Sequence, residues 1–134
     1  MSTRKRSVIV DDELIPRMAL SDRLASANYE VASAGGGAEA LTTLTQPGNS
    51  FDLIILDLLM PQPNGKAVFR RLKELSIASR TPILILTVVG LEPDIQSMMQ
   101  QGAFYLQKKY APTRILDVVQ ETLREWQRRI AEGR

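Results

Sequence analysis

Short apolar runs alternate along the chain with longer segments in which apolar and polar residues are mixed. The clearest run, Pro82-Ile83-Leu84-Ile85-Leu86, is apolar throughout and ends at Thr87, as expected of a strand that is covered on both faces. Runs of similar length end at Val10 and at Asp57. The pattern predicts five strands, at about Ser7 to Val10, Tyr29 to Ala34, Phe51 to Asp57, Pro82 to Leu86 and Phe104 to Leu106.

The segments after these runs have the spacing of helices. The last helix, from Pro112 to about Ala131, has a stripe formed by Ile115, Val119, Leu123, Trp126 and Ile130. Four earlier helices are predicted, from about Leu14 to Ala27, from the glycine-rich turn to about Leu44, from Lys66 to Leu75, and a weaker one to about Gln101. Strands that alternate with helices indicate βαβ units, so the predicted fold class is α/β with a parallel sheet.

Length and composition fit one folded domain over residues 1–134. The chain has 134 residues, of which 44% are hydrophobic and 24% charged, as in ordinary globular proteins. We expect a domain core at about residues 7–126, with a last helix that is able to continue into a linker. Cysteine and histidine are both absent, so thiolate or imidazole metal sites are excluded and any metal must bind to oxygen.

The charge pattern and the amino-terminal sequence narrow the list of partners. The net charge is +2 and the pI about 9.2, but acids and bases are mixed along the chain, so direct nucleic-acid binding is not expected. No run is long enough for a signal peptide or a membrane span, which predicts a cytoplasmic protein with no membrane partner.

Three carboxylates end the apolar runs. Asp57 follows one run, and Asp11 and Asp12 follow another. Open α/β sheets carry their chemistry at the carboxyl ends of the strands, so we expect these acids to converge there. Their mutual repulsion would be relieved by Mg²⁺, which prefers carboxylate oxygens. Taken alone, Asp11 and Asp12 also suit the start of a helix. The Gly35-Gly36-Gly37 segment lacks the spacing of a phosphate-binding loop and is interpreted as a turn.

Several motifs in order resemble the receiver domain of bacterial two-component response regulators. They are Val8-Ile9-Val10-Asp11-Asp12-Glu13, the run from Asp52 through Asp57 to Met60-Pro61 and Asn64-Gly65, Thr87, and Tyr105-Leu106-Gln107-Lys108. The resemblance covers about Ser7 to Trp126. It implies a flavodoxin-like fold, with a five-stranded parallel sheet in the order 2-1-3-4-5 and five helices on both faces.

The resemblance also implies the chemistry of the acidic pocket. Asp57 would be the phosphoacceptor, which attacks a phosphoryl group on the histidine of a kinase or phosphotransfer protein. A carboxylate nucleophile needs no general base, and phosphoryl transfer depends mainly on positioning and charge neutralisation. Mg²⁺ would be bound directly by Asp12, Asp57 and the backbone carbonyl of Leu59, and through water by Asp11. The protein would be a signalling switch and not an enzyme.

Three further residues are implied in the switch. Lys108 would contact a phosphoryl oxygen, Thr87 would donate its hydroxyl to another, and Tyr105 would rotate inward. These movements would change the surface formed by the fourth helix, the fifth strand and the fifth helix, and thereby reach a downstream output protein or domain. A phosphorylation-dependent homodimer is an open alternative for that surface.

The chain departs from the family pattern near Lys108. Counting forward from Gly102 selects Lys109 as the phosphate-binding lysine, whereas counting back from Pro112 selects Lys108, which we prefer. Lys109 also replaces a proline whose preceding peptide is typically cis in the family. A cis bond before a residue other than proline costs about 2.5–4 kcal/mol, so we expect either a trans, rearranged loop or a strained one.

Val88 and Leu59 also depart from the pattern. Val88 follows Thr87 where the family favours a small residue, and Leu59 has no polar group with which to orient a water molecule. Both changes predict a long-lived phosphoryl state.

Two other functions are compatible with parts of the sequence. A phosphatase of the haloacid dehalogenase kind would carry its nucleophile at the end of the first strand with an acid two residues later, whereas here Asp11 and Asp12 are adjacent and Asp57 follows much later. A degenerate receiver, which acts as a phosphorylation-independent interaction module, is the more serious alternative because of the irregular Lys108–Lys109 segment.

Overall fold

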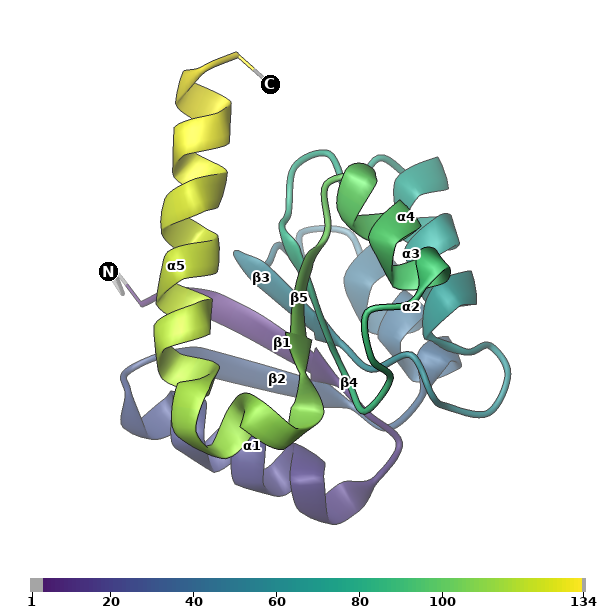
Figure 1. The fold of residues 1–134 in the computed structure, drawn as a ribbon, viewed down its shortest axis with the longest axis vertical. Helices are drawn as coiled ribbons and strands as arrows, with labels where there is room; N and C mark the ends of the chain where they lie inside the picture. Colours follow the sequence, from purple (N-terminus) through teal and green to yellow (C-terminus); the bar gives the residue numbers. More distant parts are fainter. Residues whose placement is uncertain (1–3, 134) are drawn as a thin grey trace.

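Five parallel strands form one sheet in the order β2-β1-β3-β4-β5, as predicted (Figure 1). The computed structural model describes residues 4–133. Strand β3 lies at the centre between β1 and β4, and the residues of β3 and β4 are buried throughout. The strands are β1 (Arg6–Val10), β2 (Glu30–Ala34), β3 (Leu53–Leu56), β4 (Ile83–Thr87) and β5 (Phe104–Gln107).

Helices cover both faces of this sheet, which confirms the predicted flavodoxin-like fold. Helices α1 and α5 lie on one face, and α2, α3 and α4 lie on the other (Figure 1). A short 3₁₀ turn at Lys108–Tyr110, which the sequence pattern did not predict, joins β5 to α5. The helices are α1 (Leu14–Ser26), α2 (Gly37–Thr45), α3 (Gly65–Glu74), α4 (Pro93–Gln100) and α5 (Ala111–Ala131).

Successive residues of each central strand pack into opposite halves of the core. In β3, Leu53 and Ile55 join the cluster under α1 and α5, whereas Ile54 and Leu56 join the cluster under α2, α3 and α4. Because both faces are covered, every position of the strand must be apolar, and the sequence is a continuous hydrophobic run. This burial fixes the register of the strands and therefore the positions of the residues that follow them.

The predicted stripe of α5 is buried only in part. Ile115 and Val119 are buried, but Ile130 is 51% exposed. The reason is that the last turns of α5 extend beyond the sheet (Figure 1). Within residues 4–133, no helix has the length and apolar character needed to cross a membrane.

Candidate acidic site at the carboxyl edge of the sheet

Asp11, Asp12 and Asp57 lie together at the carboxyl edge of the sheet. Asp11 and Asp12 follow β1, Asp57 follows β3, and these two strands are neighbours that pair Val10 with Leu56. One carboxylate oxygen from each acid lies within 4.8 Å of the others. The three acids offer only hard oxygen ligands, so this donor set fits Mg²⁺ better than a softer transition metal.

Backbone contacts hold the two loops that carry these acids. The Asp57 N–H donates to the Val10 carbonyl at 3.0 Å, and the Asp11 N–H donates to the Ala34 carbonyl at 3.2 Å. The start of α3 packs closely against the Asp57 loop, since a Cβ atom on Gly65 would lie only 2.2 Å from the Asp57 carbonyl oxygen. Only glycine allows this approach. Asn64 caps α3 by accepting from the Ala67 N–H at 3.0 Å.

Of the two candidate lysines, Lys108 lies in the acidic site. Its Nζ donates to Asp11 Oδ2 at 2.7 Å and to Asp57 Oδ2 at 3.3 Å. Lys109 is exposed instead, with its Nζ 5.2 Å from the centre of the Tyr110 ring. The peptide between the two lysines is trans and forms part of the 3₁₀ turn. The geometry therefore selects the rearranged trans loop over a strained cis one.

Burial and ion pairing set the protonation of the site. Asp11 and Asp57 are each only 5% exposed, whereas Asp12 is exposed. Burial raises the pKa of the Asp57 carboxyl, the charge of Lys108 opposes that rise, and the charge of Asp11 adds to it. Burial alone would lower the pKa of Lys108, but its hydrogen bond to Asp11 and the charge of Asp57 outweigh burial and raise it. The pocket thus holds a pair of buried acids that Lys108 neutralises in part.

Thr87 and Tyr105 meet at one residue of the loop after β4. Thr87 is fully buried, and its Oγ1 accepts the Val89 N–H at 3.4 Å. The Tyr105 hydroxyl donates to the Val89 carbonyl at 2.8 Å. Val89 therefore connects the two side chains through its own backbone. No feature of the sequence indicates this role, because Val89 contributes only its main-chain N–H and carbonyl to these contacts.

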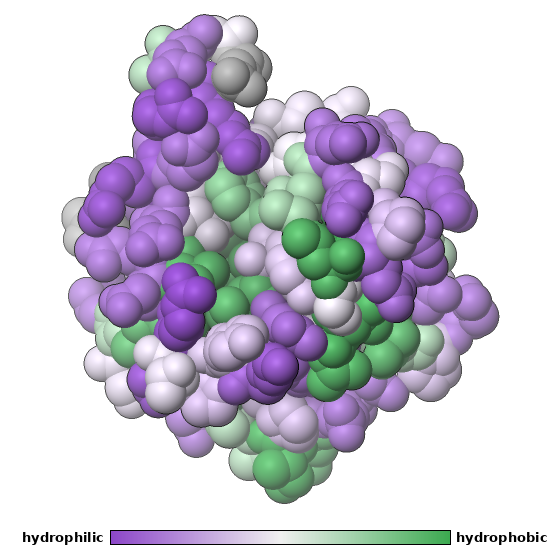
Figure 2. Space-filling view, viewed as in Figure 1, coloured by the Kyte–Doolittle hydropathy of each residue, from purple (hydrophilic) through white to green (hydrophobic). Residues whose placement is uncertain are grey.

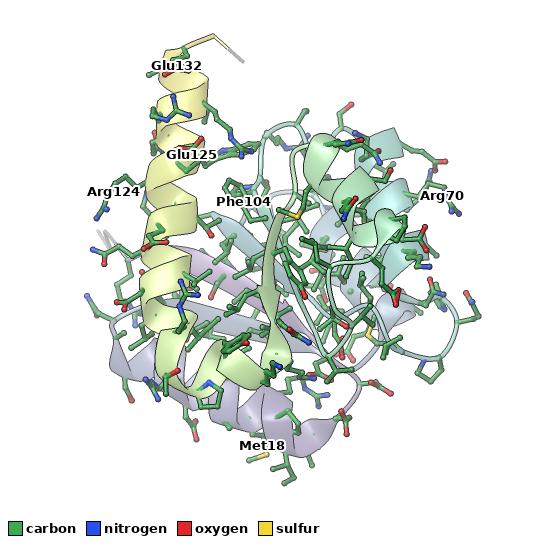
Figure 3. The ribbon with its side chains drawn as sticks, in the orientation of Figure 1. Met18, Arg70, Phe104, Arg124, Glu125 and Glu132 are labelled. Carbon is green, nitrogen blue, oxygen red and sulfur yellow. The ribbon has the colours of Figure 1, made fainter. Side chains whose placement is uncertain are left out.

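Exposed apolar side chains come from the loops that carry the site and from the start of α1. Leu59 and Val88 are 56% and 59% exposed, and Leu91 is similarly open. On α1, Leu14, Ile15 and Met18 are also exposed, and Figure 2 shows hydrophobic surface where Figure 3 labels Met18. Sequence reasoning missed this apolar surface because helix periodicity does not tell which apolar side chains remain uncovered.

Arg17 makes a second contact that the sequence did not indicate, with the backbone of Asp11. From the first turns of α1, its Nη1 donates to the main-chain carbonyl of Asp11 at 2.7 Å. The acceptor is a backbone atom, so no particular residue type at position 11 would have indicated the pair.

Comparison with known proteins assigns most of the chain to one family. A family model described as the response regulator receiver domain matches residues 8–120. A probable transcriptional regulator ycf27 from Cyanidium caldarium is 36% identical over 126 residues, which are 93% of this chain and 49% of that protein. The chain spans about half the length of the curated regulators that it matches.

Two solved structures extend the similarity to three dimensions. The chemotaxis response regulator CheY4 of Vibrio cholerae gives a TM-score of 0.80 at 32% identity, covering 90% of this chain and 99% of that one. The receiver domain of the histidine kinase CKI1 from Arabidopsis thaliana, in complex with Mg²⁺ and BeF₃⁻, gives 0.72 at 27% identity, covering 88% and 89%.

Proposed function

The chain belongs to the response regulator receiver domain family of two-component signalling, and from that premise we propose that Asp57 accepts a phosphoryl group from the phosphohistidine of a partner protein. The observation that carries the proposal is the convergence of Asp57 with two further acids and Lys108 in one pocket. A degenerate receiver would have no need for all four groups.

The transfer follows from the positions of these groups. An oxygen of Asp57 attacks phosphorus, so that a P–O bond forms while the P–N bond to the partner's histidine breaks. Lys108, already within 3.3 Å of Asp57 Oδ2, is in reach to neutralise a phosphoryl oxygen. Asp11, Asp12, Asp57 and the Leu59 carbonyl would bind Mg²⁺, which would supply the remaining positive charge at the transferred group. The similar CKI1 receiver forms a complex with Mg²⁺ and BeF₃⁻, which supports a role for Mg²⁺ in this proposal.

Thr87 and Tyr105 would couple phosphorylation to a surface change. The Thr87 hydroxyl would leave the Val89 N–H to bind a phosphoryl oxygen, and the loop after β4 would move with it. Because the Tyr105 hydroxyl bonds the Val89 carbonyl, a shift of this loop changes the position of the ring. A two-state element of this kind allows a local charge to bias a distant surface.

The surface of α4, β5 and α5 would contact the output protein or domain. Arg129 of α5 lies over the Phe104 ring of β5, with its guanidinium carbon 4.3 Å from the ring centre, and donates to the Gly102 carbonyl at 3.0 Å. Phe104 and Glu125 lie near one another on this side of the molecule (Figure 3). These contacts join α5 to the edge strand, so a movement of β5 would also move the helix. A homodimer through the same surface stays open.

The partner that supplies the phosphoryl group would be a histidine kinase or a phosphotransfer protein. The exposed apolar side chains of Leu14, Ile15 and Met18 beside the acids support a protein partner, since such patches mark protein contacts. In this proposal residues 1–134 form a single receiver unit that is not itself an enzyme.

Mass spectrometry tests the proposal directly. The protein is incubated with Mg²⁺ and a small phosphodonor, and the wild type should gain the mass of one phosphoryl group, whereas Asp57→Asn should gain none. Beryllofluoride binding that depends on Mg²⁺ is a second readout. If the wild type neither gains mass nor binds beryllofluoride, the degenerate interaction module is the correct function.

A further inference from the structure

Asp12 is held differently from the other two acids. Asp11 accepts the Glu13 N–H on Oδ1 at 2.9 Å and Lys108 on Oδ2 at 2.7 Å. Asp57 accepts the Leu59 N–H on Oδ1 at 3.3 Å and Lys108 on Oδ2. The exposed Asp12 carboxylate has no hydrogen-bond or ion-pair partner within residues 4–133. Among the described residues, the position of this carboxylate is therefore limited only by the backbone that carries it.

The peptide between Asp11 and Asp12 is fixed from the side by Arg17. The carbonyl of this peptide accepts Arg17 Nη1 at 2.7 Å. We propose, on the basis of the proposed function, that Arg17 is a positioning residue: it orients this peptide so that the Asp12 carboxylate points at the bound Mg²⁺. A charged donor makes such a bond stronger than a neutral one would be.

Gly35 provides the space that the Arg17 guanidinium needs. A Cβ atom on Gly35 would lie 3.2 Å from Nη1 and 3.6 Å from Cζ of Arg17. Gly35 is itself held in place, because its N–H donates to Glu39 Oε1 at 2.9 Å. The first residue of the glycine turn after β2 thus lies beside the arginine that contacts the turn after β1. The neighbouring Gly36 has open space around the same position, with no atom within 4 Å.

Charge and position predict opposite effects for the loss of Arg17. A cation beside a metal site repels Mg²⁺, so loss of the charge alone would strengthen Mg²⁺ binding. Loss of the hydrogen bond would release the peptide and weaken binding. Groups that orient a metal ligand typically contribute about 10–100-fold in metal affinity. The sign of the change in Mg²⁺ affinity therefore shows whether the charge of Arg17 or its hydrogen bond has the larger effect.

Titration calorimetry of Mg²⁺ binding to the whole chain tests the proposal. Arg17→Ala should weaken Mg²⁺ affinity by roughly 10-fold or more. Arg23→Ala, which removes an exposed arginine from the same helix, should leave the affinity unchanged. Arg17→Lys retains the charge and a donor but not the fork of the guanidinium, and should recover part of the loss. Thermal unfolding without Mg²⁺ monitors the fold of each variant.

A pair of glycine variants tests the same idea without any change of charge. Gly35→Ala should shift the Arg17 guanidinium by a few tenths of an ångström, disturb its hydrogen bond to the Asp11 carbonyl and weaken Mg²⁺ binding, whereas Gly36→Ala should not. This pair decides the question if Arg17→Ala does not fold. Equal or tighter Mg²⁺ binding in Arg17→Ala, or equal binding in the two glycine variants, would overturn the proposal. A wild type that does not bind Mg²⁺ would overturn the proposed function as well.

Discussion

The two halves of the pocket are built in different ways. The acidic half comes from residues that directly follow the adjacent strands β1 and β3, so strand pairing sets the spacing of Asp11 and Asp57. The basic half comes from Lys108, which follows the edge strand β5 and reaches the acids across the end of β4 with a long side chain. Backbone register fixes the first half, whereas one 3₁₀ turn and the reach of a side chain fix the second.

The largest effect should come from the basic half. Lys108→Ala should slow phosphoryl transfer to Asp57 by about 10²–10³-fold, the usual cost of one lost charge-stabilising donor. The neighbouring variant Lys109→Ala removes the same charge from an exposed side chain and serves as the matched control. Rates are followed by mass spectrometry at saturating Mg²⁺. If Lys109→Ala is the slower of the two, the assignment of the lysine is wrong.

Loss of an acid from the acidic half should lower the affinity of the protein for Mg²⁺. Asp12→Asn removes the negative charge of a direct Mg²⁺ ligand. Loss of a group that only orients a metal ligand lowers metal affinity by roughly 10–100-fold, so the loss of Mg²⁺ affinity in Asp12→Asn should be at least as large. Lys108→Ala should not weaken Mg²⁺ binding, because it removes a cation from the site. Titration calorimetry on both variants checks this contrast. Equal losses in the two variants would show that the halves are not separable.

The division between the halves also explains which parts of the site could be predicted from the sequence. The runs before Asp11 and Asp57 are apolar because both faces of the sheet are covered, so strand ends and acids followed from the pattern alone. The lysine followed only as a preference for Lys108 over Lys109, because counting from Gly102 and from Pro112 gave different residues, and the local turn decides between them. The side chains of Arg17 and Tyr105 donate to main-chain carbonyls, and every residue type has such a carbonyl, so the sequence does not indicate these contacts.

Stability should depend on pH through Asp57. Burial raises the pKa of its carboxyl, so the folded state holds the proton more tightly than the unfolded chain does. Stability contributed by the protonated form is therefore lost as pH rises from the ordinary value of about 3.9 through the raised one. At neutral pH the ionised Asp57 is a cost that Asp57→Asn removes.

The expected result is a melting temperature a few degrees higher for Asp57→Asn than for the wild type, measured at pH 7 in EDTA. The difference should fade as the pH falls below the ordinary carboxyl pKa of about 3.9, because the wild-type carboxyl then becomes protonated in both states. Addition of Mg²⁺ should stabilise the wild type more than the variant. A lower melting temperature for Asp57→Asn at pH 7 would mean that the Lys108 ion pair outweighs the burial of the charge.

The smallest effects should come from the exposed side chains that flank the two halves. Val88 follows Thr87 on the switch side, and Leu59 lies two residues after Asp57 on the acidic side. Val88→Ala should widen the approach to the phosphoryl group, and Leu59→Asn should supply a polar group that orients water. Each variant should speed loss of the aspartyl phosphate by less than tenfold, which is under about 1.4 kcal/mol of barrier.

Decay of the phosphorylated protein in the presence of Mg²⁺, followed by mass spectrometry, measures both effects on one scale. A larger effect for Leu59→Asn would mean that the lack of an oriented water limits hydrolysis, whereas a larger effect for Val88→Ala would mean that steric access limits it. Rapid decay in the wild type would contradict both explanations, because neither side chain would then protect the phosphoryl group. The double variant adds a last test: independent barriers should sum, since the two residues lie on separate loops.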